Sequence, residues 1–263
     1  MILGLYLSPC WAISDVEIRK SPYDNRHYKG LYLDNGLKIL LVSDPSADKA
    51  AAALNVQAGS FNESVEREGL AHFLEHMLFL GTKKYPRADE YSEYISSHGG
   101  SDNAWTMDRN TQFYFDVLPS ALEGALDRFA QFFIAPLFNA DLVDRERHAV
   151  NSEYQLSIQN DGRRIMQADS ITANPAHPIA QFSMGSLETL GDNPKFPPIR
   201  QALIEFYNNY YSPERMTLAV VAPQPLAELE KIVNIIYLAN FVISIKSENF
   251  IPRVIAIFHK EFG

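Results

Sequence analysis

The sequence predicts an α+β domain built on a mixed, mostly antiparallel β-sheet with helices packed on one side. Two observations predict this class: short alternating runs come as hairpins, and helical patterns stand in separate stretches. With 263 residues and 46% hydrophobic content, the chain is long enough to bury one large core. We therefore expect one main domain, and the sequence shows no internal repeat.

The elements of the first half follow from turn signals and alternation. Asp34-Asn35-Gly36 predicts a hairpin turn between two strands. The Gly99-Gly100 pair predicts a break after a helix. The expected elements are a hairpin over residues 28–42, a strand over 50–56, a helix around residues 72–76, a helix over 88–97, and extended segments over 103–107 and 111–117.

Prolines and glycines organise the second half. Pro119 suits the first position of a helix that we expect to run to about residue 134. A long helix is expected over residues 139–158. Residues 161–198 are rich in Gly, Pro, Asn and Ser, which predicts irregular structure with short helical pieces along one wall of the cleft. The remaining expected elements are a helix over 198–210, a strand over 216–222, and a helix that Pro225 opens.

The five residues His72-Phe73-Leu74-Glu75-His76 carry the strongest chemical signal. On a helix, positions three and four apart share a face, so His72, Glu75 and His76 project to the same side. Neutral imidazole is a good zinc ligand, and a catalytic zinc generally has three protein ligands and one open position. The order H-x-x-E-H is the signature of the inverted zincins. We expect the two histidines to bind zinc and Glu75 to be the general base that activates water.

The residues around this pentapeptide bear on the alternative, in which both histidines lie on an ordinary helix face without metal. Leu70-Ala71 precede it and Met77-Leu78-Phe79-Leu80 follow it, so the helix is expected to be buried and to end near Gly81. Buried imidazoles and a buried carboxylate cost free energy unless they are paired or bind metal. The apolar flanks therefore favour a ligand site.

A site of this kind needs a third protein ligand, and residues 141–154 supply two candidates. Glu146 and Glu153 are seven positions apart, which is two helical turns, so they share a face. Either carboxylate could reach a metal. The alternative is that both are surface residues of a charged helix, which is where most Glu residues lie. Spacing alone leaves the choice open.

Three separated segments stand in a characteristic order: Gly69 to Thr82, then Asn103-Ala104-Trp105-Thr106, then Asn151-Ser152-Glu153-Tyr154. Together they resemble the M16 metallopeptidases, of the pitrilysin, insulin-degrading enzyme and protease III type. The likeness runs from about residue 21 to about residue 230. It implies an N-terminal catalytic domain over residues 21–230 with the LuxS/MPP-like metallohydrolase fold.

The resemblance also implies a role for each residue and one Zn²⁺ per chain. His72 and His76 would be zinc ligands, with Glu153 as the third. Glu75 would be the catalytic base, and Glu146 a carboxylate that supports the site. The implied activity is that of a zinc-dependent metalloendopeptidase that hydrolyses peptides or small proteins.

The four residues Asn103-Ala104-Trp105-Thr106 have two interpretations. Taken without the family, Asn103 is best explained as a turn residue and Trp105 as a core aromatic. The resemblance implies instead an edge strand that binds substrate peptide, which adds itself to the sheet through backbone hydrogen bonds. All four residues are then candidates for substrate binding.

Composition narrows the partners and the compartment. The net charge of -9, without a basic stripe, argues against a nucleic-acid partner. No apolar run reaches 18 residues, so we expect no integral membrane segment. Cys10 is the only cysteine, which rules out intrachain disulfides and a cysteine-based zinc site. The apolar start resembles the end of a signal peptide, so residues 1–20 are expected to be a signal remnant and extension. This suggests a bacterial periplasmic protein, with the cytoplasm as the alternative.

Residues 231–263, rich in isoleucine and aromatic residues, no longer resemble the family. We expect an atypical tail here, truncated or frameshifted relative to the family, whose members of the pitrilysin type continue into a second homologous half. Two hypotheses follow. The chain is a zinc endopeptidase that works alone, as a homo-oligomer or with a second M16 half. Alternatively, it is a truncated half-enzyme that binds zinc and peptide with little activity unless that half is supplied.

Overall fold

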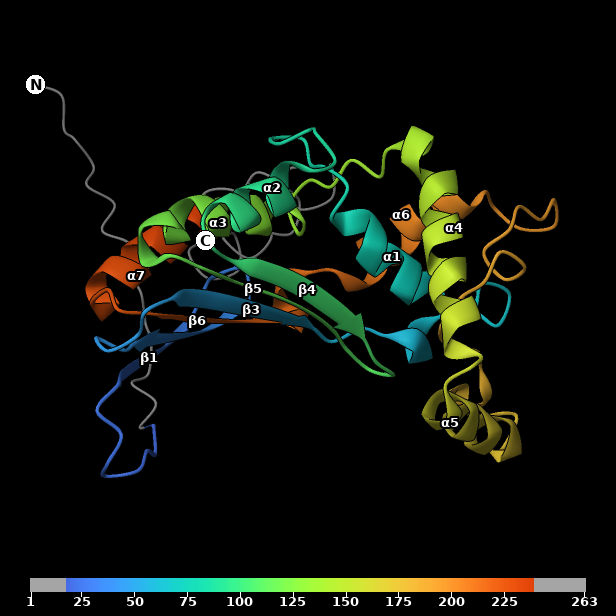
Figure 1. The fold of residues 1–263 in the computed structure, drawn as a ribbon, viewed down its shortest axis with the longest axis horizontal. Coiled ribbons are helices and arrows are strands. Elements are labelled where there is room, and N and C mark those ends of the chain that lie inside the picture. Colours follow the sequence, from blue (N-terminus) through green and yellow to red (C-terminus); the bar gives the residue numbers. More distant parts are fainter. Residues whose placement is uncertain (1–17, 239–263) are drawn as a thin grey trace, which may run out of the picture.

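The computed structural model describes residues 18–238 (Figure 1). Residues 1–17 of the expected signal remnant and extension, Cys10 among them, and residues 239–263 of the expected tail lie outside this part. The strands are β1 (His27–Tyr32), β2 (Lys38–Ser43), β3 (Ala50–Val56), β4 (Ser101–Thr106), β5 (Thr111–Val117) and β6 (Met216–Ala222). The α-helices are α1 (Leu70–Leu78), α2 (Glu90–Ser97), α3 (Leu122–Gln131), α4 (Ala140–Ser157), α5 (Asp161–Thr172), α6 (Ile199–Tyr210) and α7 (Leu226–Val233).

The six strands form one sheet in the order β1-β2-β6-β3-β5-β4. Strands β2 and β6 pair in parallel, and every other neighbouring pair is antiparallel. The predicted mixed, mostly antiparallel sheet is confirmed. Its first hairpin turns at the expected place, where Gly36 has a φ of 89°, a left-handed conformation that favours glycine. Strand β4 lies at one edge of the sheet, beside β5.

The helices that cover the sheet lie on one of its faces, as predicted (Figure 1). Strands β3 and β5 alternate between buried and half-buried residues, so one face of each strand meets the core. That face contributes Phe113 and Phe115, which pack edge to face against Phe133 and Phe129 of the helical layer. Each fully buried side chain of this size stabilises the fold by roughly 1.5–3 kcal/mol.

Helix α1 is anchored in this core by its apolar side. Phe73, Leu74 and Met77 are fully buried, while His72 and His76 on the other side stay partly accessible. The helix ends at Leu78, and Gly81, just beyond it, has a φ of 95°. The pentapeptide is therefore helical and buried on one side, as the apolar flanks predicted. Helix α1 also lies next to edge strand β4, which brings the two expected parts of the site together.

Two expectations are wrong. Residues 161–172 form one regular helix of 12 residues, α5, where irregular structure with short helical pieces is expected, and none of its residues is buried. Asn160 caps this helix by accepting a hydrogen bond from the Arg163 amide at 3.0 Å. The interpretation of Asn103 as a turn residue and Trp105 as a core aromatic also fails, since both lie in edge strand β4 and Trp105 is 41% exposed. In the described part, no helix combines the length and apolarity needed to cross a membrane.

Candidate functional site

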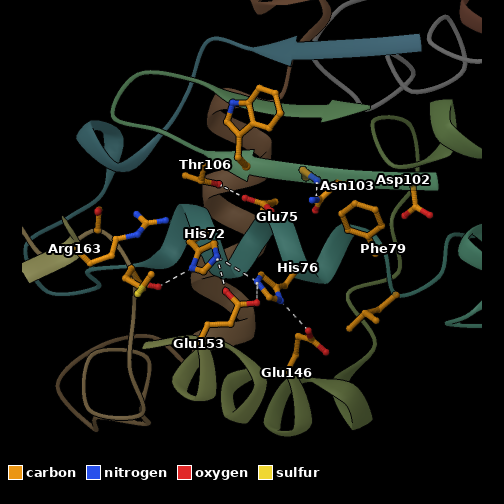
Figure 2. Close-up of a pocket in the computed structure, with 15 residues that line it drawn as sticks. His72, Glu75, His76, Phe79, Asp102, Asn103, Thr106, Glu146, Glu153 and Arg163 are labelled. Carbon is orange, nitrogen blue, oxygen red and sulfur yellow. Dashed lines mark hydrogen bonds and ion pairs between the residues drawn. The ribbon is translucent and has the colours of Figure 1, made fainter. Parts of the chain in front are cut away.

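Three elements meet at one cavity of about 510 Å³ (Figure 2). Helix α1 contributes the histidines and Glu75, and helix α4 contributes its two glutamates from the side facing α1. Edge strand β4 forms the opposite wall, next to Glu75. The residues lining the cavity include every site residue that the sequence suggested: His72, Glu75, His76, Asn103, Ala104, Trp105, Thr106, Glu146 and Glu153.

The candidate ligand atoms converge. The Nε2 atoms of His72 and His76 lie 3.2 Å apart. The Glu153 carboxylate oxygens lie 3.4 Å from His72 Nε2 and 3.6 Å from His76 Nε2. One ligand atom from each of these three residues lies within 4.8 Å of the others, an arrangement that could hold a metal ion. Of the two carboxylates that spacing left open, Glu153 is the one that faces both Nε2 atoms.

The second nitrogen of each histidine is occupied by an acceptor. His72 Nδ1–H donates to the backbone oxygen of Met184 at 2.7 Å. His76 Nδ1–H donates to Oε1 of Glu146 at 2.9 Å. Metal-binding histidines typically donate their other N–H group in this way, which fixes the tautomer and the ring orientation. Both Nε2 lone pairs are therefore directed toward the same point.

This donor set fits zinc. Two lone pairs that face each other at 3.2 Å repel unless a proton or a cation lies between them. Two nitrogens bound at about 2.0–2.1 Å to one tetrahedral zinc are themselves about 3.3 Å apart, close to the separation seen here. Two imidazoles and one carboxylate also match the ligand set of zinc hydrolases.

The ionisable groups of the site shift one another's pKa values. Burial lowers the pKa of His76, but the contacts with Glu146 and Glu153 outweigh burial and raise it to about 9. The adjacent imidazoles of His72 and His76 hold the pKa of Glu153 well below its usual range. A half-exposed carboxylate that stays ionised is suited to balance a cation at the Nε2 atoms.

Glu75 is oriented differently from Glu153. Its carboxylate turns toward strand β4, where Oε2 accepts a hydrogen bond from the Thr106 hydroxyl at 2.6 Å (Figure 2). Burial raises the pKa of Glu75, while the Thr106 hydroxyl and the two histidines oppose that rise. A carboxylate with a raised pKa beside a metal site has the properties of a general base that later acts as an acid.

The start of helix α1 is held by a buried acid that the sequence did not single out. Glu63 accepts hydrogen bonds from the amides of Gly69 and Ala71, both at 2.7 Å. These amides belong to the first turn, where helix N–H groups lack partners within the helix. Burial raises the pKa of Glu63 to about 8, and the two amides oppose the rise. Glu63 therefore fixes the start of the helix that carries both histidines.

Other residues at the site were also missed or underrated. Phe79, one turn beyond His76, lines the cavity, and so does Arg163 at the start of α5. The Met184 oxygen could not have been found, because a backbone carbonyl leaves no mark in the residue pattern. Spacing did bring out Glu146 and Glu153, since both lie on one face of α4.

The family models, the related sequences and the solved structures that match this chain all indicate the same family. The model of the insulinase family, peptidase family M16, matches residues 38–176. A model described as the peptidase M16 inactive domain matches residues 198–252. Insulin-degrading enzyme of Homo sapiens is 49% identical over 218 residues, which is 82% of this chain and 21% of that protein. Protease 3 of Escherichia coli (strain K12) is 47% identical over 221 residues, 84% of this chain and 23% of that protein.

A solved structure shares the same fold. The crystal structure of pitrilysin matches with a TM-score of 0.83 and 44% sequence identity, covering 86% of this chain and 24% of that one. The chain thus spans about a fifth to a quarter of the length of these relatives. The M16 model covers more than half of the chain, including the helix with the two histidines and the helix with Glu146 and Glu153. This chain belongs to the insulinase family, peptidase family M16.

Proposed function

We propose that this chain is the catalytic part of a zinc-dependent metalloendopeptidase that hydrolyses peptides or small proteins. The observation that carries the proposal is the convergence of His72 Nε2, His76 Nε2 and the Glu153 carboxylate, with Glu75 beside them. The edge strand along the same cavity supplies a place for an extended substrate. The relatives that share this chain's sequence are named as proteases and as an insulin-degrading enzyme, which supports a peptide substrate.

His72, His76 and Glu153 would hold one Zn²⁺ per chain, and Glu146 would support it by fixing the His76 ring. When bound, zinc supplies a Lewis acid that lowers the pKa of water toward neutrality and polarises a carbonyl. The neutral Nε2 atoms and the ionised Glu153 together carry one negative charge into the site. That leaves the cation with a net positive charge for the substrate carbonyl.

Glu75 would move the protons of the reaction. Its carboxylate takes a proton from the attacking water and later gives it to the leaving amine. Thr106 donates to Oε2, so that oxygen is held and Oε1 is the one available for proton transfer. The raised pKa of Glu75 brings its affinity for a proton closer to neutral pH, which suits both steps.

Strand β4 would bind the substrate backbone. Among the described residues, β4 is paired on one side only, by β5, so its other side offers donors and acceptors to an extended peptide. The amide of Ala104 donates to Oδ1 of Asn103 at 2.9 Å, a bond that a substrate carbonyl would replace. Main-chain recognition of this kind tolerates many side chains, which suits a peptidase of broad specificity.

One observation favours the second candidate, a half-enzyme that binds zinc and peptide and needs a further M16 half for turnover. The Glu153 side chain is 50% exposed and Trp105 is 41% exposed, so one side of the cavity is open to solvent. A closed site excludes water and strengthens the electrostatic interactions within it. The partner in this proposal is a second M16 half or another copy of the chain.

The proposed domain boundaries are those expected from the sequence. Residues 21–230 would be the catalytic domain and residues 1–20 a signal remnant and extension. Residues 231–263 would be an atypical tail, of which residues 231–252 fall within the match to the M16 inactive-domain model. Export to the bacterial periplasm is part of this proposal, with the cytoplasm as the alternative. Fractionation of expressing cells and N-terminal sequencing test it: mature protein in the periplasm supports export, whereas cytosolic protein that keeps Met1 contradicts it.

The decisive experiment measures zinc content and cleavage of an internally quenched peptide, with Glu75→Gln as the matched variant. One zinc is expected in both proteins, and cleavage is expected from the wild type alone. Cleavage that survives in Glu75→Gln would contradict the role of Glu75 as base. Zinc binding without cleavage by the wild type selects the half-enzyme.

A further inference from the structure

The ligands of the candidate metal centre come from two helices far apart in the sequence, and one loop contacts both. This loop, residues 182–190, lies between α5 and α6. On the α1 side, the Phe182 amide donates to Oε1 of Glu68 at 3.1 Å, just before the helix starts. Two residues later the Met184 oxygen accepts the hydrogen bond from His72 Nδ1. The loop is therefore hydrogen-bonded both to Glu68, which lies just before α1, and to the turn of α1 that carries His72.

The same loop is bonded to α4, which carries Glu146 and Glu153. The Leu187 amide donates to Oδ1 of Asn151 at 3.1 Å. The Phe182 ring packs edge to face on Tyr154, the residue after Glu153, with centroids 5.0 Å apart. A third contact joins Nη1 of Arg147 to the Leu190 oxygen at 3.4 Å. These three contacts are spread along α4, before and after Glu153.

Two glycines bring the loop close enough for the Met184 oxygen to reach His72. Gly69 and Gly185 both have left-handed φ angles, 85° and 86°. Their backbones touch: a Cβ on Gly69 would lie 2.1 Å from Gly185 Cα. A Cβ on Gly185 would meet the side chains of Leu190 at 2.9 Å and Val150 at 3.2 Å. Any other residue at position 185 would have to hold a left-handed φ and displace the Leu190 side chain, so it strains the turn next to the Met184 peptide.

We propose that the 182–190 loop is the positioning element of the metal centre, orienting His72 through the Met184 oxygen and holding α4 against α1 through Asn151. Gly69 allows the close approach, and Gly185 is the key residue within the loop because its left-handed φ favours glycine beside the Met184 peptide. The inference rests on the metal site proposed above. The loop keeps the proton of His72 on Nδ1, so that the Nε2 lone pair faces His76 and Glu153. None of the loop's residues needs to touch the metal or the substrate.

The test compares Gly185→Ala and Asn151→Ala with Gly30→Ala as a control. Gly30 lies on β1, and a Cβ there would have no atom within 4 Å. Asn151→Ala removes the acceptor of the Leu187 amide without adding a side chain to the loop, so it serves even where Gly185→Ala folds poorly. Long-range ¹H–¹⁵N NMR of the metal-free proteins identifies which nitrogen of His72 carries the proton. Competition with a chromophoric chelator gives zinc affinity, and the Co²⁺ absorption spectrum reports the ligand geometry.

The expected result for Gly185→Ala is a mixture of His72 tautomers, a changed Co²⁺ spectrum and zinc binding weakened roughly 10- to 100-fold. Asn151→Ala should shift the same readouts in the same direction by a smaller amount, and Gly30→Ala should leave them unchanged. A loop that is merely structural would lower thermal stability and leave the tautomer and zinc affinity at wild-type values in both variants; that result overturns the inference. A wild type that binds no zinc refutes the proposed metal centre instead, while the NMR comparison still decides the role of the loop.

Discussion

Glu146 offers the sharpest quantitative prediction, because its one clear task is to accept the Nδ1–H of His76. The two atoms are 2.9 Å apart, and both side chains are largely buried, at 13% and 17% exposed. A hydrogen bond to a charged acceptor contributes about 1.5–3 kcal/mol. At about 1.4 kcal/mol per factor of ten, the loss of this bond weakens zinc binding by roughly 10- to 100-fold. Partners of metal-binding histidines show effects of the same size.

The perturbation is Glu146→Ala, and the assay is zinc competition against a chelator of known affinity at constant pH. Asp141→Asn is the matched control, since Asp141 lies on the same helix, is exposed and does not line the cavity. The variant should lose affinity, and the control should match the wild type. Equal zinc affinity in all three proteins would refute the reasoning that Glu146 orients His76.

Three further predictions concern other parts of the site. Burial raises the pKa of Glu63 to about 8, so folding retains a proton that the unfolded chain releases near pH 4.5. The resulting stability is complete below about pH 4.5 and is lost as the pH rises through about 8. Denaturant unfolding should show this decline in the wild type and a shallower one in Glu63→Gln; equal slopes would contradict it. Thr106→Val removes the hydroxyl that holds Glu75 and should lower kcat by about tenfold while zinc affinity stays constant; a loss of zinc would place Thr106 in a different role. Trp105→Ala should reduce the free energy of unfolding by less than about 1.5 kcal/mol, because the ring is half exposed, and a much larger loss in calorimetry would mean that the ring belongs to the core.

Most of the fold could be predicted because its signals are local. The turn at Asn35-Gly36, the alternation in β3 and β5, and Pro119 each specify an element through nearby residues. Helix α5 was missed because Gly162 in its first turn and the Gly- and Pro-rich residues after it both favour irregular structure. None of its residues is buried, and its apolar residues Ile165, Met166 and Ile171 are exposed, so no contact with the core marks this helix.

The parts of the candidate site that depend on residue spacing within one helix could be predicted. The parts that depend on how distant elements pack together could not. The spacing of His72 and His76 specifies a shared helix face without reference to the rest of the chain. Spacing could not decide between Glu146 and Glu153, because that choice depends on how α4 packs against α1. The position of Trp105 depends on β4 being an edge strand, which is a property of the sheet as a whole. The Met184 oxygen lies 112 positions from His72, and only the folded chain brings the two together.

The zinc ligands are proposed to be His72, His76 and Glu153. Glu75 is proposed to act as general base and not to bind the zinc. Zinc per chain, measured by elemental analysis after dialysis, tests this directly in the wild type, His76→Ala and Glu75→Gln. We expect one zinc per chain in the wild type and in Glu75→Gln, and almost none in His76→Ala. Zinc retained by His76→Ala, or lost from Glu75→Gln, would contradict the account.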